Sequence, residues 1–161
     1  MYIRPTISRD EEAIVHLWHR GWHDAHADLV PPEVLSYRTK SHFIIWFREA
    51  QDTFYVAQSG ENLVGFVSLK GPEVVKLYVD VGARGTGVAS TLLNFAEQTL
   101  RQGGILEAEL LCTTGNARAE RFYLRQGWSL LDTFDDALWA PAAVSQKFVV
   151  STRRYRKNLS A

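Results

Sequence analysis

The chain contains little that belongs to secreted or membrane proteins. Its 161 residues include one cysteine, Cys112, which excludes an intrachain disulfide framework and fits a reducing compartment. No window approaches the ~18 uncharged apolar residues of a membrane span. The N-terminal segment also lacks the apolar run of a secretory signal. We therefore expect a soluble, cytoplasmic protein with no membrane partner.

An excess of charge is also missing. The 18 Lys and Arg residues balance the 18 Asp and Glu residues. Nucleic-acid-binding domains usually present a basic face, so this balance predicts no nucleic-acid partner. A cationic run near the C-terminus is interpreted as a solvated strand end and tail (Arg153, Arg154, Arg156, Lys157). The length suits a single domain over residues 1–161.

Hydrophobic spacing predicts alternating strands and helices. Helical spacing begins after Ser8 or Asp10, either of which can cap the first helix, and recurs near residues 39–50 and 88–100. A fourth, short helix follows Asn116. Strands are expected over residues 2–4, 53–58, 63–69, 73–79, 105–113, 128–134 and 147–154. This order predicts an α/β fold of the mixed α+β kind, with a mostly antiparallel sheet, one parallel strand pair and helices on both faces.

The most informative segment is residues 77–89, where a strand turns through Arg84-Gly85-Thr86-Gly87 into a helix. Such a turn leaves several backbone N–H groups unpaired, and the helix dipole adds about half a positive charge there. These features predict a diphosphate site. Two other phosphate motifs are excluded: the turn has no Gly-Lys-Ser/Thr end, and Ser90 stands where a dinucleotide fingerprint needs its third glycine.

The turn and a second motif together resemble the GNAT acetyltransferase superfamily. Residues 84–89, Arg-Gly-Thr-Gly-Val-Ala, match the Arg/Gln-x-x-Gly-x-Gly/Ala signature of that family. Further along come Asn116, a helix bearing Phe122-Tyr123, and Gly127-Trp128, which are similar to its second signature. Two departures are Val81, where the family often has proline, and Trp128, where it usually has phenylalanine. The resemblance covers nearly the whole chain in element order.

The resemblance implies acetyl-CoA as co-substrate and a primary amine, on a small molecule or a peptide, as acceptor. It implies direct transfer in a ternary complex, from a slot where the two parallel strands splay apart, and a homodimer as the default assembly. The residues that would bind the co-substrate lie on the strand, the turn and the second motif (Leu77, Tyr78, Val79, Arg84, Gly85, Thr86, Gly87, Val88, Ala89, Asn116 and Tyr123). Two alternatives remain: a non-catalytic acyl-CoA-binding domain on this fold, and a phosphate-binding module of another fold.

The resemblance also suggests catalytic groups. Tyr123 lies two helical turns after Asn116 and matches a tyrosine that the family commonly uses as general acid. Glu73 matches a position where some members carry a carboxylate base. The alternative interpretation is a solvated glutamate at the end of a strand. The backbone N–H of Val79 would stabilise the oxyanion. Asn116 is expected to cap its helix and to contact the pantetheine.

Four of the five histidines lie on the first predicted helix, and His16, His19, His23 and His26 fall on one side of it. This side is either a polar helix face or, with Trp22, a border of the acceptor pocket. The second interpretation makes His19, Trp22, His23 and His26 substrate-binding residues. No carboxylate or thiolate completes a ligand set, so no metal site is expected.

Overall fold

In the computed structural model, which describes residues 1–160, one mixed sheet forms the centre of the chain. Its seven strands lie in the order β1-β2-β3-β4-β5-β7-β6. Their bounds are β1 (Tyr2–Pro5), β2 (Thr53–Ser59), β3 (Asn62–Lys70), β4 (Glu73–Val79), β5 (Glu107–Thr113), β6 (Ser129–Ala137) and β7 (Val149–Asn158). All neighbouring strands are antiparallel except β4 and β5, which are parallel. The predicted sheet type is therefore confirmed.

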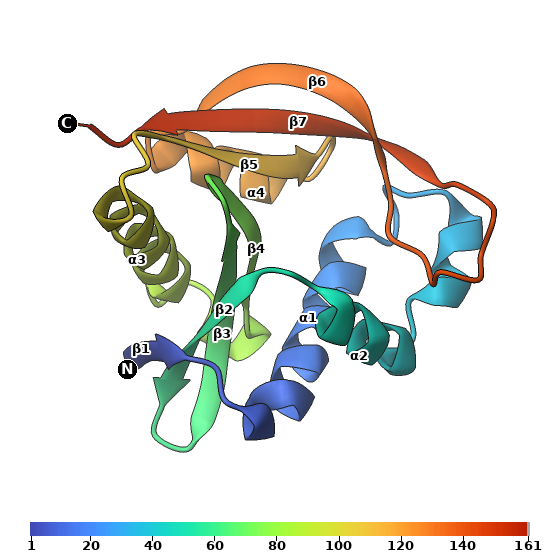
Figure 1. Ribbon diagram of the computed structural model, residues 1–161, viewed down its shortest axis with the longest axis horizontal. Coiled ribbons are helices and arrows are strands. Elements are labelled where there is room, and N and C mark those ends of the chain that lie inside the picture. The colour runs from blue at the N-terminus through green and yellow to red at the C-terminus, as the bar shows by residue number, and fades with distance from the viewer. Residues whose placement is uncertain (161) are drawn as a thin grey trace.

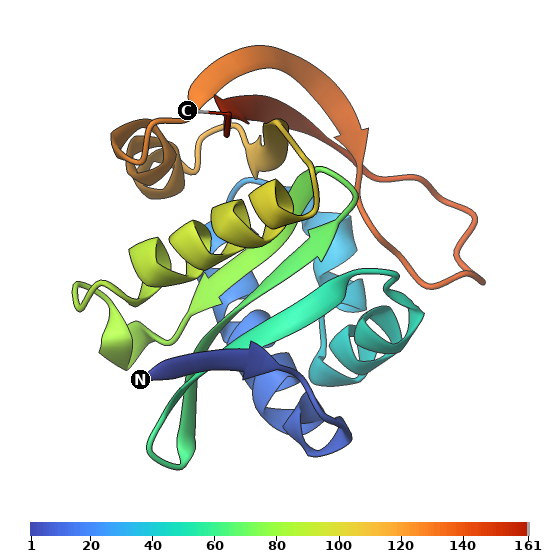
Figure 2. The same ribbon diagram turned by 60° about the vertical axis from the view of Figure 1, so that its left-hand side comes forward.

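Helices cover both faces of this sheet (Figure 2). The helices are α1 (Glu11–His26), α2 (Lys40–Glu49), α3 (Val88–Gln102) and α4 (Ala117–Arg125), with short 3-10 turns η1 (Ser8–Asp10), η2 (Pro32–Tyr37) and η3 (Val81–Ala83). One apolar cluster joins α3 and α4 to the sheet, and a second joins α1 and α2 to the opposite face. Because β4 contributes to both clusters, its side chains alternate between the two layers.

The parallel pair β4–β5 separates soon after it begins. Only Glu73 with Glu109 and Val74 with Leu110 are paired. Beyond them β5 runs with β7 and β6 across the top of the molecule, while β4 continues downward with β3 (Figure 1). A bulge starts this separation, because Ser68 faces Lys76 and Leu69 faces Val74, which leaves Val75 without a partner in β3.

The separation leaves main-chain groups of β4 without a strand partner. Asp80 donates its N–H to the Val64 carbonyl at 2.8 Å. Hydrogen-bonded pairs alternate along an antiparallel ladder. Val79, opposite Gly65, and Leu77, opposite Val67, are therefore the residues whose N–H and C=O groups point away from β3 and toward the gap.

Two local expectations are wrong. Asp10 is the N-cap residue of α1, but its carboxylate accepts from the Ile7 N–H at 2.8 Å and from Arg4, because η1 precedes α1 and uses that side chain first. The cationic residues 153–157 are not a tail: β7 extends to Asn158, and these side chains pair with carboxylates on neighbouring elements. No helix within residues 1–160 is long and apolar enough to cross a membrane.

Candidate active site

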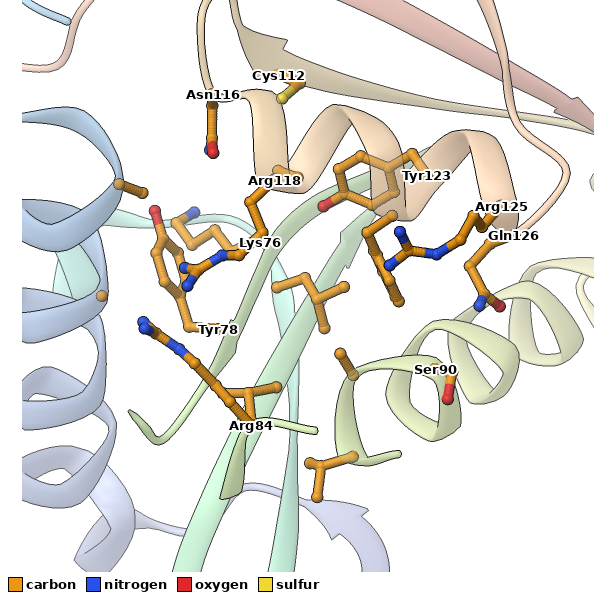
Figure 3. A pocket seen from close by; sticks show the side chains of 18 of the residues that line it. Lys76, Tyr78, Arg84, Ser90, Cys112, Asn116, Arg118, Tyr123, Arg125 and Gln126 are labelled. Atoms are coloured by element: carbon orange, nitrogen blue, oxygen red, sulfur yellow. The ribbon is translucent and has the colours of Figure 1, made fainter. Parts of the chain in front are cut away.

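A cavity of about 590 Å³ occupies the gap between the two parallel strands. Its walls come from residues 75–79 of β4, the turn before α3, the first turn of α3, residues 111 and 112 of β5, α4, and one side of α1. Figure 3 shows how these elements surround the opening, with Tyr78 and Arg84 on the β4 side and Asn116, Arg118 and Tyr123 on the α4 side. The unpaired main chain of β4 therefore faces a space that runs on to the start of α3.

The turn before α3 has a backbone that only glycine adopts easily. Gly85 and Gly87 have φ angles of 77° and 87°. No side chain or main-chain atom lies within 4 Å of the Cβ position of Gly85, so a ligand can approach its backbone directly. The N–H groups of Gly85 and Gly87 have no acceptor among residues 1–160. The first N–H groups of α3 are free by the geometry of a helix start. Together they form a cradle suited to an anion.

Arginine side chains add positive charge around this cradle. Arg84 precedes the two glycines, and Arg118 and Arg125 lie two turns apart on the same face of α4 and line the cavity. The Arg84 guanidinium lies 3.5 Å from the Asp24 carboxylate of α1. Sequence reasoning missed Arg118 and Arg125, although their spacing of seven residues on one helix was a usable signal.

Tyr123 and Asn116, both predicted site residues, line the cavity. The Tyr123 hydroxyl is directed into it (Figure 3) and has no hydrogen-bond partner among residues 1–160. Burial raises the pKa of this phenol, so it stays protonated at neutral pH. The Asn116 side chain makes no capping hydrogen bond, so the expected side-chain cap is wrong. Its amide is directed toward the cavity instead (Figure 3).

Cys112 is also part of the cavity wall. Burial raises the pKa of its thiol to about 12, and the neighbouring Glu120 carboxylate acts in the same direction. Because the thiolate is the nucleophilic form, this thiol is inert at neutral pH. Cys112 therefore contributes shape to the cavity and supplies no nucleophile.

Glu73 is not among the residues that line the cavity. It opens β4 beside a buried ion pair, in which Lys76 Nζ lies 2.5 Å from the Asp52 carboxylate. Ser68 donates to the same carboxylate at 2.7 Å. Burial, and then the Asp52 charge, raise the pKa of Glu73. Lys76, which sequence reasoning missed, lines the cavity, and burial lowers its pKa.

The histidine side of α1 is not a polar helix face, because α2 and η2 pack against it. The rings of His19 and Phe43 pack edge to face with 5.6 Å between their centroids. His23 Nε2 is 2.7 Å from the Arg38 carbonyl oxygen. Trp22 is 4% exposed and belongs to the core. Of the four residues proposed for the acceptor, only His26 lines the cavity. Thr86, in the turn, is likewise outside the lining, and its hydroxyl donates to the Ala83 carbonyl.

Comparison with known proteins identifies the family of this chain. A model described as the acetyltransferase (GNAT) family matches residues 12–128, and the chain belongs to that family. Its members are N-acetyltransferases that use acetyl-CoA and bind amine acceptors. A relative in Mycobacterium tuberculosis, described as an uncharacterized N-acetyltransferase, is 27% identical over 100 residues. That match covers 59% of this chain and 64% of the relative.

Solved structures agree on the fold. An N-acetyltransferase from Staphylococcus aureus Mu50 superposes with a TM-score of 0.72 at 19% identity, covering 98% of both chains. The PaiA N-acetyltransferase from Thermoplasma acidophilum, solved with coenzyme A, gives 0.66 at 20% identity and covers 98% of this chain and 99% of that one. An aminoglycoside 6′-N-acetyltransferase, also complexed with coenzyme A, gives 0.68 at 13% identity, covering 100% and 98%.

Proposed function

We propose that the protein moves an acetyl group from acetyl-CoA to a primary amine by direct attack, without a covalent enzyme intermediate. One observation carries this proposal. The strand residues with free main-chain groups, Leu77 and Val79, open into the same cavity as the glycine turn and α3. A long ligand with an anionic end and an amide-containing arm would use both at once.

The cavity residues fit coenzyme A. The turn from Arg84 to Ala89 would hold the diphosphate, since Gly85 leaves its backbone open and the N–H groups there are free. Leu77 and the carbonyl of Val79 would pair with the pantetheine amides, whereas the main chain of Tyr78 pairs with β3. The Asn116 amide makes no capping hydrogen bond and would add a further contact. Arg118 and Arg125 would neutralise phosphate charge. Bound acetyl-CoA supplies an activated thioester at the splayed end of the strands.

The remaining chemistry falls to the chain's own groups. We assign the general acid to Tyr123, whose hydroxyl is protonated and free of other partners in the cavity. The Val79 N–H would stabilise the oxyanion. Glu73 would accept the proton of the acceptor ammonium, but six residues of strand put it roughly 20 Å from Val79. The proton would therefore travel through water or along the Lys76 and Asp52 side chains, which lie beside Glu73.

Two measurements on the purified protein test this function. Calorimetry with coenzyme A should show binding, and thiol release from acetyl-CoA should rise when primary amines are added. Mass spectrometry should find the acetylated amine. If coenzyme A binds but no amine in a panel of polyamines, amino acids, aminoglycosides and peptides is acetylated, the chain is a non-catalytic acyl-CoA-binding domain. If coenzyme A does not bind, the assignment of the cavity is wrong.

A further inference from the structure

Arg38 is a buried cation without an anion. Arg38 directly follows η2 and is 1% exposed. One guanidinium nitrogen, Nη1, donates to the Tyr37 carbonyl at 3.1 Å. The other two, Nε and Nη2, are buried and have no hydrogen-bond partner among residues 1–160. A buried charge is usually paired, because leaving it without a partner costs several kcal/mol.

The surroundings explain how the protein tolerates this cation. Three indole rings enclose the guanidinium, with centroids 4.8 Å (Trp22), 5.0 Å (Trp46) and 5.7 Å (Trp139) from Cζ. Cation–π attraction offsets part of the lost hydration, but it uses the faces of the rings and satisfies no N–H group. Lys76, which lies 6.0 Å from the Trp46 ring, pairs with the Asp52 carboxylate, and Arg38 makes no ion pair within residues 1–160. The N–H groups of Nε and Nη2 therefore have no acceptor within the described residues.

Arg38 is not among the residues that line the cavity, but it lies one side chain away from it. Trp22, which touches Arg38, also contacts His26 at 5.5 Å between ring centroids. On the far side, Trp139 belongs to the loop between β6 and β7, which runs beside η2 and α2 (Figure 1). Trp139 stacks on Trp46, with 5.0 Å between the ring centroids and an angle of 4° between the ring planes. The guanidinium is thus covered by helices on one side and by a loop side chain on the other.

We infer that Arg38 is the anchor for a carboxylate of the acceptor, and that the acceptor is an amino acid or a similar small molecule with an apolar side chain. This inference rests on the proposed acetyl transfer. A carboxylate matches the two free nitrogens, because Nε and Nη2 lie on one edge of the guanidinium and bind carboxylate oxygens in parallel. Apolar side chains of the cavity wall, Val75, Leu77 and Leu111, would contact an apolar side chain of the acceptor. An amine with no carboxylate would leave Arg38 unpaired.

Matched acceptors test the inference on the wild-type protein. L-phenylalanine, L-methionine and L-leucine are each compared with the corresponding carboxamide, which keeps the amine and loses the charge. The kcat/KM for the best carboxylate should exceed that for its amide by about 30-fold or more, the scale of a charged hydrogen bond. Equal values for each pair overturn the inference, while acetylation of both members of a pair would leave the proposed function standing.

Variants assign the preference to this residue. Arg38→Met, which keeps length and apolar contact with the indoles, should remove the preference by raising KM for the carboxylate acceptor while KM for acetyl-CoA stays within about twofold. Arg48→Met is the control, since Arg48 is an exposed arginine on the neighbouring helix that pairs with Glu11 at 2.7 Å. A preference that survives in Arg38→Met overturns the inference.

A binding measurement keeps the test independent of turnover and of the variant's folding. Calorimetry of the wild-type protein saturated with coenzyme A compares N-acetyl-L-phenylalanine with N-acetyl-L-phenylalaninamide, the product and its uncharged analogue. The carboxylate should bind about 30-fold more tightly, and Arg38→Lys should lose most of that difference because an ammonium does not bind bidentately. Equal affinities in the wild-type protein overturn the inference. A failure to bind coenzyme A at all would instead count against the proposed function.

Discussion

The Tyr78 ring occupies the space that a side chain on Gly21 would need. A Cβ on Gly21 would lie 2.5 Å from Cδ1 of Tyr78. Gly21 is inside α1, where glycine is the poorest non-proline residue by about 1 kcal/mol relative to alanine. The ring is held on its other side by Phe66, at 5.6 Å between centroids. The glycine is therefore kept for the position of Tyr78 in the cavity wall.

Replacing Gly21 with alanine should displace Tyr78. We expect kcat/KM for the acceptor to fall by about 10-fold, with no gain in Tm despite the better helix propensity. Coenzyme A affinity by calorimetry should change little, because the glycine turn lies at another part of the cavity. Gly103→Ala is the matched control, since its nearest atom is 3.4 Å away and it lies outside the cavity. A Gly21→Ala protein with full activity and a raised Tm would contradict this account.

Alanine at Gly87 should weaken coenzyme A binding. Gly87 has φ of +87°, and an L-residue there costs about 1–2 kcal/mol. The strain moves the N–H groups that form the cradle, and we expect the Kd for coenzyme A to rise about 10-fold. Gly60→Ala separates strain from function, because Gly60 has φ of +61° in the β2–β3 hairpin and lies outside the cavity. Both variants should lose similar stability, but only Gly87→Ala should lose affinity. Equal affinities would exclude this turn as the phosphate site.

Removing the Tyr123 hydroxyl should lower kcat. Tyr123→Phe keeps the ring and its packing on Phe122 but deletes the proposed acid, and general acid catalysis contributes about 100-fold or more. KM for acetyl-CoA should hardly change. Tyr155→Phe is the opposite control, because that buried hydroxyl donates to Glu120 at 2.6 Å and should affect stability by about 1 kcal/mol while kcat is kept. If Tyr123→Phe keeps its kcat, Tyr123 is a packed aromatic and no acid.

Sequence reasoning succeeded where a local pattern determines local geometry. The glycines at 85 and 87 predict positive φ, and the structure has it at both. Alternating strands and a helical crossover predict the parallel pair, which the structure also contains. These features depend on steric and periodic rules that operate within a few residues.

The sequence did not predict which side chains are covered by a second layer of helices. His19, His23 and Trp22 share one side of a helix, but the sequence of that helix does not reveal that α2 and η2 cover it. Arg38 looks like an ordinary surface arginine, because nothing near it in sequence predicts enclosure by indoles from 22, 46 and 139. Such sites arise from contacts between distant segments, which no local periodicity encodes.

His26 should make stability fall in mild acid. Burial lowers its pKa from 6.5 to about 4, with a smaller contribution in the same direction from Arg38. The unfolded chain therefore takes up a proton near pH 6.5 while the folded chain does not, so the stabilisation present above pH 6.5 is lost as the pH falls toward 4. The difference amounts to no more than about 3 kcal/mol. Tm measured from pH 7.5 to 4 should fall less steeply for His26→Gln than for wild type, and parallel curves would contradict this.

The pH dependence of transfer tests Glu73. A carboxylate base works only when ionised, so kcat/KM should rise with pH through its pKa. Burial and the Asp52 charge raise that pKa, which moves the acid limb above the ordinary glutamate value of about 4.3.

Glu73→Gln should abolish this limb and lower the rate at neutral pH. It should not destabilise the fold there, because a raised pKa in the folded state means that ionised Glu73 opposes folding once the pH exceeds it. Glu109→Gln is the control: Glu109 faces Glu73 across β4–β5, and removing its charge should move the limb slightly to lower pH without abolishing it. An acid limb that persists in Glu73→Gln would assign the proton to another acceptor.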